Sequence, residues 1–349
     1  MPEDTAKTPD TGGIGTLPPD SAAFSERDLD LVNALQINPR ASWTRIGATL
    51  GLDATTVARR WQRLTDAGLA WMTAYAPEFA TIGHVRVHCR APDLAAVSAA
   101  VCATPSVFSV ERIAGRHQLQ LSVAAENLAA LDDFTVVHLA ALPGIEEVRV
   151  AISLHMYVEG SHWRPQALDA AQRIELLDDR EQPAPSPAQR RAGDAALMLA
   201  LSADGRRSAA ELAQDTGLSE TTVRRRLAEM TRSGRLIIRC DMAQQAAGWA
   251  VNMHYWVRIP ADELDKLGAA LAGWPEIRLC VATTDASNVL LIAWLRNQQE
   301  SIHLETRLLH SFPALRIVER QMTLRVLKRM GRLLGPDGRA IGRVPFAVW

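Results

Sequence analysis

An internal repeat constrains the fold of this chain more than any other feature. The stretch GLDATTVARRWQRL begins at Gly51, and GLSETTVRRRLAEM begins 166 positions later at Gly217. The match continues without a gap over about 40 residues and keeps glycines, threonines and arginines in register. Chance similarity between two alanine-rich helices would not preserve all three residue types, so the architecture contains a duplicated unit.

Each copy of the repeat predicts three helices. In the first copy, Ser25 is the candidate N-cap of the first helix, a short second helix ends at Gly51, and a third helix runs from Asp53 to Gly68. A short helix, a glycine-containing turn and a longer helix form the helix-turn-helix pattern. The longer helix of this motif lies in the major groove of DNA, with its first residues facing the bases. The repeat therefore predicts two DNA-binding units.

The third helix of each copy has an apolar face and a face of hydroxyl and guanidinium groups. Val57, Trp61 and Leu64 share one side at helical spacing and are expected to be buried. On the other sides, threonines allow close approach, and arginines reach guanine edges or phosphates. These outward side chains are the predicted DNA-binding residues: Thr55, Thr56, Arg59, Arg60, Arg63, Thr221, Thr222, Arg224, Arg225 and Arg226. A solvated charged face is the alternative, and the presence of two matched copies favours DNA contact.

A second pattern follows each three-helix unit. Strand-like alternation and helical periodicity appear in the order β-α-β-β-α-β, which is the ferredoxin-like unit. The predicted fold class is therefore α+β, with two helix-turn-helix domains, each followed by a ferredoxin-like module, duplicated to form a pseudo-dimer. Trp256 and Trp294 lie on predicted strands and are candidates to face a sensing cavity.

These patterns divide the chain into nine segments. Each half comprises a helix-turn-helix domain, a connecting strand and a ferredoxin-like module. In order, the segments are a disordered leader (1–23), the first helix-turn-helix domain (24–69), a connecting strand (70–83), the first ferredoxin-like domain (84–160), a linker (161–188), the second helix-turn-helix domain (189–235), a connecting strand (236–249), the second ferredoxin-like domain (250–330) and a C-terminal tail without periodicity (331–349).

Composition limits the remaining classes. The 38 basic and 39 acidic residues nearly cancel, so a nucleic-acid surface must be a local patch. The four cysteines lie far apart and form no CxxC or zinc spacing, so neither disulfides nor a metal site is expected. No apolar run is long enough to span a membrane, and the start lacks the basic and apolar regions of a signal peptide. We expect a cytoplasmic protein without a cofactor.

The order of a helix-turn-helix, a connecting strand and a β-α-β-β-α-β module resembles the leucine-responsive regulator/AsnC (Lrp/AsnC) family of bacterial transcription factors. The resemblance covers about residues 25–330, twice over, and is most specific in GLDATTVARRWQRLTDAGL and at Pro77, Ile82 and Gly83. It implies a one-chain pseudo-dimer that is a regulator and not an enzyme. The implied partners are double-stranded DNA, a small-molecule effector (an amino acid or another metabolite) and further copies of the chain, as a dimer of pseudo-dimers. Because the two recognition helices differ, an imperfect palindrome is expected.

The resemblance also implies an effector site at the turn between the second and third strands of each module. In similar modules a glycine opens this turn and an acidic residue follows three positions later. The corresponding residues are Gly115 and Gln118 in the first module, and Asp285 and Asn288 in the second. An amide does not attract an ammonium group as a carboxylate does. This departure argues against a plain amino acid as the effector, or for two unequal sites.

Two other functions remain as alternatives. Haem-biosynthesis decarboxylases resemble the same two-module fold, and His88, Arg116 and His117 are candidates for a role in such an enzyme. An effector-binding scaffold without DNA is the other alternative. Outward arginines on both recognition helices favour the regulator, because a decarboxylase does not need them. Two histidine pairs have spacings that a metal ion could use, but ordinary strand or helix faces explain them better: His84 with His88, and His303 with His310.

Overall fold

A computed structural model describes residues 24–76, 81–177, 191 and 193–345. The predicted leader, Pro77, the proline-rich part of the linker and the last four residues lie outside the described residues. Within the described residues, no helix is both long and apolar enough to cross a membrane.

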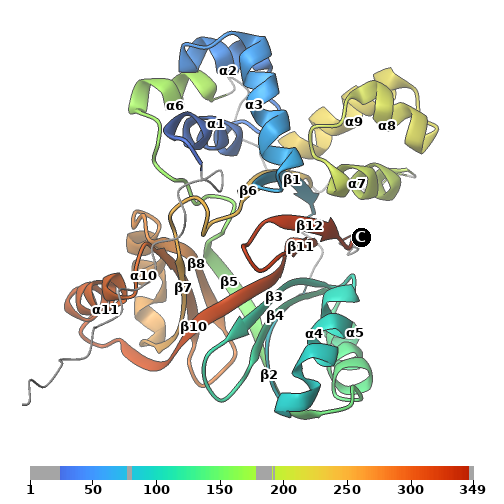
Figure 1. Ribbon diagram of the computed structural model, residues 1–349. Coiled ribbons are helices and arrows are strands. Elements are labelled where there is room, and N and C mark those ends of the chain that lie inside the picture. Colours follow the sequence, from blue (N-terminus) through green and yellow to red (C-terminus); the bar gives the residue numbers. More distant parts are fainter. Residues whose placement is uncertain (1–23, 77–80, 178–190, 192, 346–349) are drawn as a thin grey trace, which may run out of the picture.

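The two helix-turn-helix units, called the first and second heads below, each contain the three predicted helices (Figure 1). The helices of the first head are α1 (Glu26–Ile37), α2 (Trp43–Leu50) and α3 (Ala54–Asp66), and those of the second are α7 (Asp194–Ala203), α8 (Ala209–Thr216) and α9 (Glu220–Arg232). Ser25 caps α1 through a capping box with Asp28, and Asp53 accepts a hydrogen bond from the Thr56 N–H at the start of α3. The predicted caps are confirmed.

The two connecting strands pair with each other. β1 (Ala70–Tyr75) and β6 (Ile237–Met242) form a two-stranded antiparallel ribbon in which Ala70 lies opposite Met242 and Tyr75 opposite Ile237. This ribbon lies between the heads and the large sheet (Figure 1). Since β1 follows α3 and β6 follows α9, the ribbon joins both recognition helices to the rest of the molecule.

Both modules have the predicted β-α-β-β-α-β order. The first consists of β2 (Thr81–Cys89), α4 (Leu94–Ala103), β3 (Val107–Ile113), β4 (Leu119–Ala125), α5 (Leu128–Asp133) and β5 (Ile145–Val158). The second consists of β7 (Val251–Arg258), α10 (Leu264–Leu271), β8 (Ile277–Thr283), β9 (Val289–Leu295), α11 (Gln299–Ser311) and β10 (Arg316–Arg329). Residue n of the first module corresponds to residue n + 170 of the second, as the equivalent strand pairs Thr81–Ala125 and Val251–Leu295 show.

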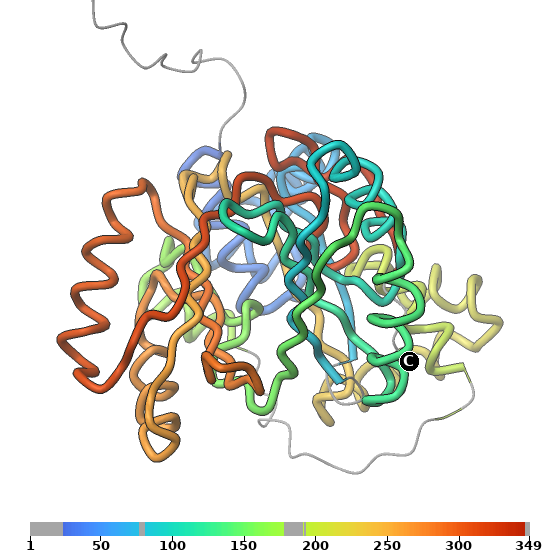
Figure 2. The backbone as a smooth tube through the Cα atoms, turned by 90° about the horizontal axis from the view of Figure 1, so that it is seen from below, coloured from blue at the N-terminus to red at the C-terminus, as the bar shows by residue number. Residues whose placement is uncertain are grey.

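The last strand of each module crosses into the other module. β5 pairs with β2 along its first half and with β8 along its second, while β10 pairs with β7 and then with β3. Eight strands thereby close into a ring in the order β10, β3, β4, β2, β5, β8, β9, β7. Seen from below, the helices of the two modules cover opposite outer sides of this ring (Figure 2). Apolar clusters fill the space between each set of helices and its strands.

Two segments differ from the simple predictions, and the linker contains the short helix that its sequence indicates. The amphipathic helix predicted after β4 ends early at Asp133 and continues as one π-helical stretch, Phe134–Leu139. The linker contains α6 (Ala170–Leu176), which packs against the first head. The tail was predicted to lack periodicity, but β11 (Arg332–Leu334) and β12 (Ala340–Arg343) form a hairpin that extends the sheet. Neither strand is long enough to show alternation in the sequence. Gly335 and Gly338 lie in the turn between the strands, so the segment reads as a glycine-rich tail.

Candidate nucleic-acid interface and central cavity

Each recognition helix buries its predicted apolar face. Val57, Trp61 and Leu64 of α3 are 0%, 7% and 0% exposed. Their counterparts on α9 are likewise buried: Val223, Leu227 and Met230. Because these faces are fixed in the cores of the heads, the opposite face of each helix must point to solvent.

The exposed face of each helix carries most of the predicted DNA-binding residues. On α3, Thr55 and Arg59 lie one turn apart and are exposed, and the Arg63 side chain is 43% exposed. On α9 the exposed members of the set are Thr221, Arg224 and Arg225. Arg224 also bonds to Glu220, one turn earlier in the helix. We call these two rows of threonine and arginine side chains the ridges of α3 and α9.

Two of the predicted arginines, one in each head, point inward, and Arg63 also lies 2.6 Å from the Asp28 carboxylate while its side chain stays 43% exposed. Arg60 lies 3.4 Å from the buried carboxylate of Asp28, and Arg226 lies 3.3 Å from that of Asp194, at the equivalent position of the second head. Burial alone would raise the pKa of Asp28, but hydrogen bonds from Ser25 and Arg63 outweigh it and hold that pKa below its usual value. The duplicated ion pairs therefore anchor each recognition helix to the first helix of its head.

Two arginines join the heads to each other. Arg40 donates to the carbonyl oxygens of Gly205 (2.6 Å) and Arg207 (3.0 Å). Its counterpart Arg206 donates to those of Pro39 (2.6 Å) and Ala41 (3.0 Å). The Arg206 guanidinium also stacks on Trp43, 3.8 Å from the ring centroid. We call this reciprocal contact the clasp. It fixes the orientation of one head relative to the other about a pseudo-twofold axis.

The first head has an additional neighbour. Arg45 of α2 donates through Nε (3.0 Å) and Nη2 (2.7 Å) to the carbonyl oxygen of Glu175 in α6, and Gln172 donates to that of Thr49. The position equivalent to Arg45 is Glu211, whose carboxylate caps α8 through Ser208. The surfaces beside the two ridges are therefore unequal, in addition to the differences between the recognition helices.

Two of the residues predicted to bind an effector, Gln118 and Asn288, form hydrogen bonds with backbone groups at strand ends. The Gln118 side-chain oxygen accepts from the Cys89 N–H at 3.0 Å, and Asn288 bonds both the N–H and the C=O of Ile259. Asp285 accepts a hydrogen bond from Arg86. Gly115 has a φ of +132°, which suits a glycine in this turn. An effector site at these turns stays a prediction.

The candidate decarboxylase residues lie at or beside the same turn of the first module, and His88 of β2 contacts the Arg116 carbonyl oxygen. His88 contacts Glu146 at 3.2 Å, and Arg116 contacts Glu147 at 2.7 Å. His117 lies 3.7 Å from Glu147. In the described part of the chain, no cluster of three or more side chains suited to a metal ion occurs.

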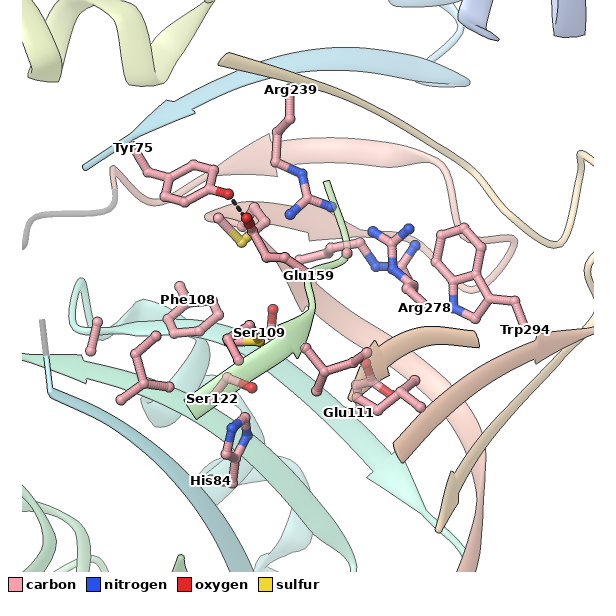
Figure 3. A pocket seen from close by; sticks show the side chains of 18 of the residues that line it. Tyr75, His84, Phe108, Ser109, Glu111, Ser122, Glu159, Arg239, Arg278 and Trp294 are labelled. Carbon is pink, nitrogen blue, oxygen red and sulfur yellow. Dashed lines mark hydrogen bonds between the residues drawn. The ribbon is translucent and has the colours of Figure 1, made fainter. Parts of the chain in front are cut away.

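A cavity of about 280 Å³ lies inside the strand ring, at the end covered by the ribbon (Figure 3). Tyr75 of β1 and Arg239 of β6 form part of its roof, and Tyr75 donates a hydrogen bond to Glu159 beyond the end of β5. Residues from both modules line its sides, including pairs at equivalent positions. The cavity therefore lies on the pseudo-twofold axis and touches the strands that lead to both heads.

Three arginines line this cavity: Arg239, Arg278 and Arg329. Arg239 and Arg278 both donate to Asp241, each at 2.9 Å. Arg278 and Arg329 also stack on Trp294, at 3.7 and 4.8 Å from its centroid. Burial, together with the neighbouring Arg239, lowers the pKa of Arg278 to about 9.

Histidine and glutamate groups lie deeper in the ring. Glu111 accepts from Asn252 (2.7 Å), His254 (2.9 Å) and Thr323 (2.7 Å). His84, at the position equivalent to His254, contacts Ser153 at 3.1 Å, and burial lowers its pKa to about 4. His84 is therefore neutral at pH 7, and only one of the two equivalent histidines has a carboxylate partner in this network.

Sequence analysis found only part of this cavity. Trp294 lines it as expected, whereas Trp256 is fully buried beside it and donates to Gln321 at 3.3 Å. The arginines were missed because each lies on a strand with ordinary alternation. A comparison of the modules would have found the site, since equivalent lining positions differ strongly in size, as Ala124 and Trp294 do.

Comparisons with known proteins agree with this architecture. The model of the AsnC-type helix-turn-helix domain matches residues 25–65 and 192–231, and that of the Lrp/AsnC ligand binding domain matches residues 83–163. The chain belongs to the Lrp/AsnC family. A leucine-responsive regulatory protein of Rhizobium meliloti (strain 1021) is 25% identical over 135 residues, which are 36% of this chain and 86% of that protein. The match therefore covers most of that regulator and little more than a third of this chain.

The two-module arrangement is also present in a solved structure. The siroheme decarboxylase NirDL, in co-complex with an iron-uroporphyrin III analogue, matches with a TM-score of 0.57 and 13% identity, covering 88% of this chain and 93% of that one. A second structure of NirDL gives the same TM-score at 14% identity. At this identity the likeness shows a shared fold only.

Proposed function

We propose that this Lrp/AsnC-family chain is a sequence-specific DNA-binding regulator that reads an imperfect palindrome with its two heads. The presentation of the ridges carries the proposal. Each ridge is exposed, while Arg60 and Arg226 anchor the helices that bear them. The clasp supports the same conclusion, because two half-sites can be read together only if the heads keep a fixed separation.

The unequal heads determine what kind of operator is expected. Where α3 has Ala58 and Trp61, α9 has Arg224 and Leu227. Phosphate contacts supply most of the affinity and make it strongly dependent on salt, while the arginines nearest the bases supply specificity. The operator should therefore contain two related but different half-sites, and a small-molecule effector adjusts its occupancy.

Selection of bound fragments from the source genome, followed by mobility shifts at two salt concentrations, tests this proposal. Arg59→Ala and Arg225→Ala should each weaken binding to the selected site by about 1–3 kcal/mol and relax one half-site. Arg320→Ala removes an exposed arginine of β10, 60% exposed and far along the chain from both ridges, and should leave the affinity unchanged. Equal binding at both salt concentrations, or an unchanged footprint in both ridge variants, would contradict the proposal.

A second candidate is a decarboxylase that acts on an iron tetrapyrrole. NirDL shares only the fold, and the observation that favours this candidate is the presence of arginines and His84 in the central cavity. A cavity of about 280 Å³ is nevertheless small beside a macrocycle, being near the lower end of the range for small-molecule sites. Titration with iron uroporphyrin III decides between the candidates: the regulator predicts no saturable change in porphyrin absorbance, and the enzyme predicts one.

A further inference from the structure

The two walls of the central cavity differ at equivalent positions. The side chains that the second module contributes are called the arginine wall, and those that the first module contributes are called the facing wall. Because β10 crosses over, the backbone of Arg329 pairs with Ser109 of β3, and its guanidinium reaches Trp294. The arginine wall carries Arg278, Trp294 and Arg329, where the facing wall carries Phe108, Ala124 and Glu159. Charge is therefore distributed unevenly across a cavity that the backbone makes nearly symmetric.

The arginine wall has N–H donors that remain available to a negatively charged group of a ligand. Asp241 is shared between Arg239 and Arg278, and Arg329 donates to the neutral amide of Gln244. A guanidinium carries five N–H donors, so these contacts leave donors available on the wall. Burial lowers the pKa of Arg278 and of Arg329, which is the effect expected where nearby anions only partly offset the loss of water.

The carboxylates on the other sides have partners of their own. Glu159 accepts from Tyr75, and Glu111 accepts from three groups in the interior of the ring. Glu111 and Asp241 both act on Arg329, but the three arginines Arg239, Arg278 and Arg329 outnumber these two carboxylates, so a second anion in the cavity is best placed against Arg278 and Arg329.

The remaining lining is mostly apolar. Carbon atoms of Ile82, Phe108, Leu279, Ile292 and Met330 face the same space. A ligand that fills it must bury an apolar body while keeping its charge at one end, as is usual for small-molecule sites with a few convergent polar groups. At about 280 Å³, the space suits a small molecule.

We propose that the central cavity binds one small organic acid per chain, with its carboxylate on Arg278 and Arg329 and its apolar body among the apolar residues that line the rest of the cavity. This site is distinct from the turns at Gly115 and Asp285. The ligand would touch Tyr75 and Arg239 of the ribbon, so it can influence the heads; that influence rests on the proposed DNA-binding function, whereas the binding itself does not.

Calorimetric titration of the full chain in the absence of DNA tests the site. The probes are 3-phenylpropanoate and 3-phenylpropan-1-ol, which share an apolar body and differ in the charged head. We expect one site per chain and a preference of at least about tenfold for the acid, because a hydrogen bond to a charged group contributes more than one between neutral groups. Arg278→Gln should remove the preference, and Arg320→Gln on the outer surface should retain it.

A cavity-filling variant provides a test that does not disturb the arginines. Ser122→Ile places on the facing wall the residue that occupies the equivalent position, Ile292, and should abolish binding of both probes. Mobility shifts with the same variant report separately on DNA binding, so a failed ligand site and a failed regulator are distinguishable. Equal affinity for the two probes, no saturable heat with either, or an unchanged acid preference in Arg278→Gln would overturn the proposal.

Discussion

The clasp predicts how the two heads cooperate. Replacing Arg40 and Arg206 together by alanine removes four hydrogen bonds from guanidinium groups to backbone carbonyls across the pseudo-twofold axis. A hydrogen bond to a charged group contributes about 1.5–3 kcal/mol when buried. These groups are partly exposed, so we take about 2–3 kcal/mol for the whole clasp, with the stacking of Arg206 on Trp43 included.

This free energy holds the heads at one separation before DNA binds. Without it, binding of the second head no longer benefits from a fixed geometry, and the effective concentration of that head at its half-site falls. Affinity for DNA with both half-sites should fall by about 30- to 140-fold in the double variant, since about 1.4 kcal/mol corresponds to a factor of ten. Affinity for DNA with a single half-site should remain that of the unmodified chain.

Mobility shifts with full-site and half-site DNA measure both quantities. Arg207→Ala is the matched control, because the Arg207 side chain bonds to Asp215 within its own head while its backbone carbonyl still serves Arg40. The control should leave both affinities unchanged. If full-site and half-site DNA lose affinity to the same extent in the double variant, the clasp does not set the separation and the reasoning is wrong.

Two further predictions concern stability. Burial alone would raise the pKa of Glu111, but His254, Arg329 and Thr323 lower it from its usual 4.5 to about 2, so this carboxylate contributes stability above pH 4.5 that is lost as the pH falls toward 2. Urea unfolding should therefore show Glu111→Gln less stable than the unmodified chain by on the order of 3 kcal/mol at pH 7, with a smaller difference at pH 3, and a constant difference would count against the assignment. Gly51→Ala and Gly68→Ala should both lose about 1–2 kcal/mol, because φ is +66° and +65° at these positions. Gly68→Ala should lose more in thermal unfolding, since its Cβ would lie 2.4 Å from the Ala340 carbonyl oxygen, whereas nothing lies within 4 Å at Gly51; equal losses would show that the tail hairpin does not pack there.

The helix-turn-helix units were predictable because their signals are local. Caps such as Ser25 and Asp53 and the buried face of Val57 follow from spacing within one helix. The roles of Arg60 and Arg226 were not predictable in this way. A helical period separates inward from outward positions, but it does not reveal that Asp28 or Asp194 lies on another helix where it can pair with the arginine.

The order of strands was also predictable, but their partners were not. Alternation in β5 and β10 indicates long strands and gives no sign that each changes partner halfway, at Ser153 and Thr323. The predicted effector positions depend on the family resemblance, and the contacts of Gln118 and Asn288 with strand ends became visible only in three dimensions. The cavity arises from volume differences between modules, which periodicity does not measure.

The unequal walls of the cavity have a consequence that only a fused chain allows. In a symmetric homodimer, a cavity on the twofold axis has identical sides, so an asymmetric ligand would bind in two equivalent orientations. Every mutation would also appear on both sides of the cavity at once. Here Ala124 can change without Trp294, and Glu159 without Arg329. Fusion of the two copies into one chain therefore permits a single bound orientation of the ligand and lets the residues on each side of the cavity change independently.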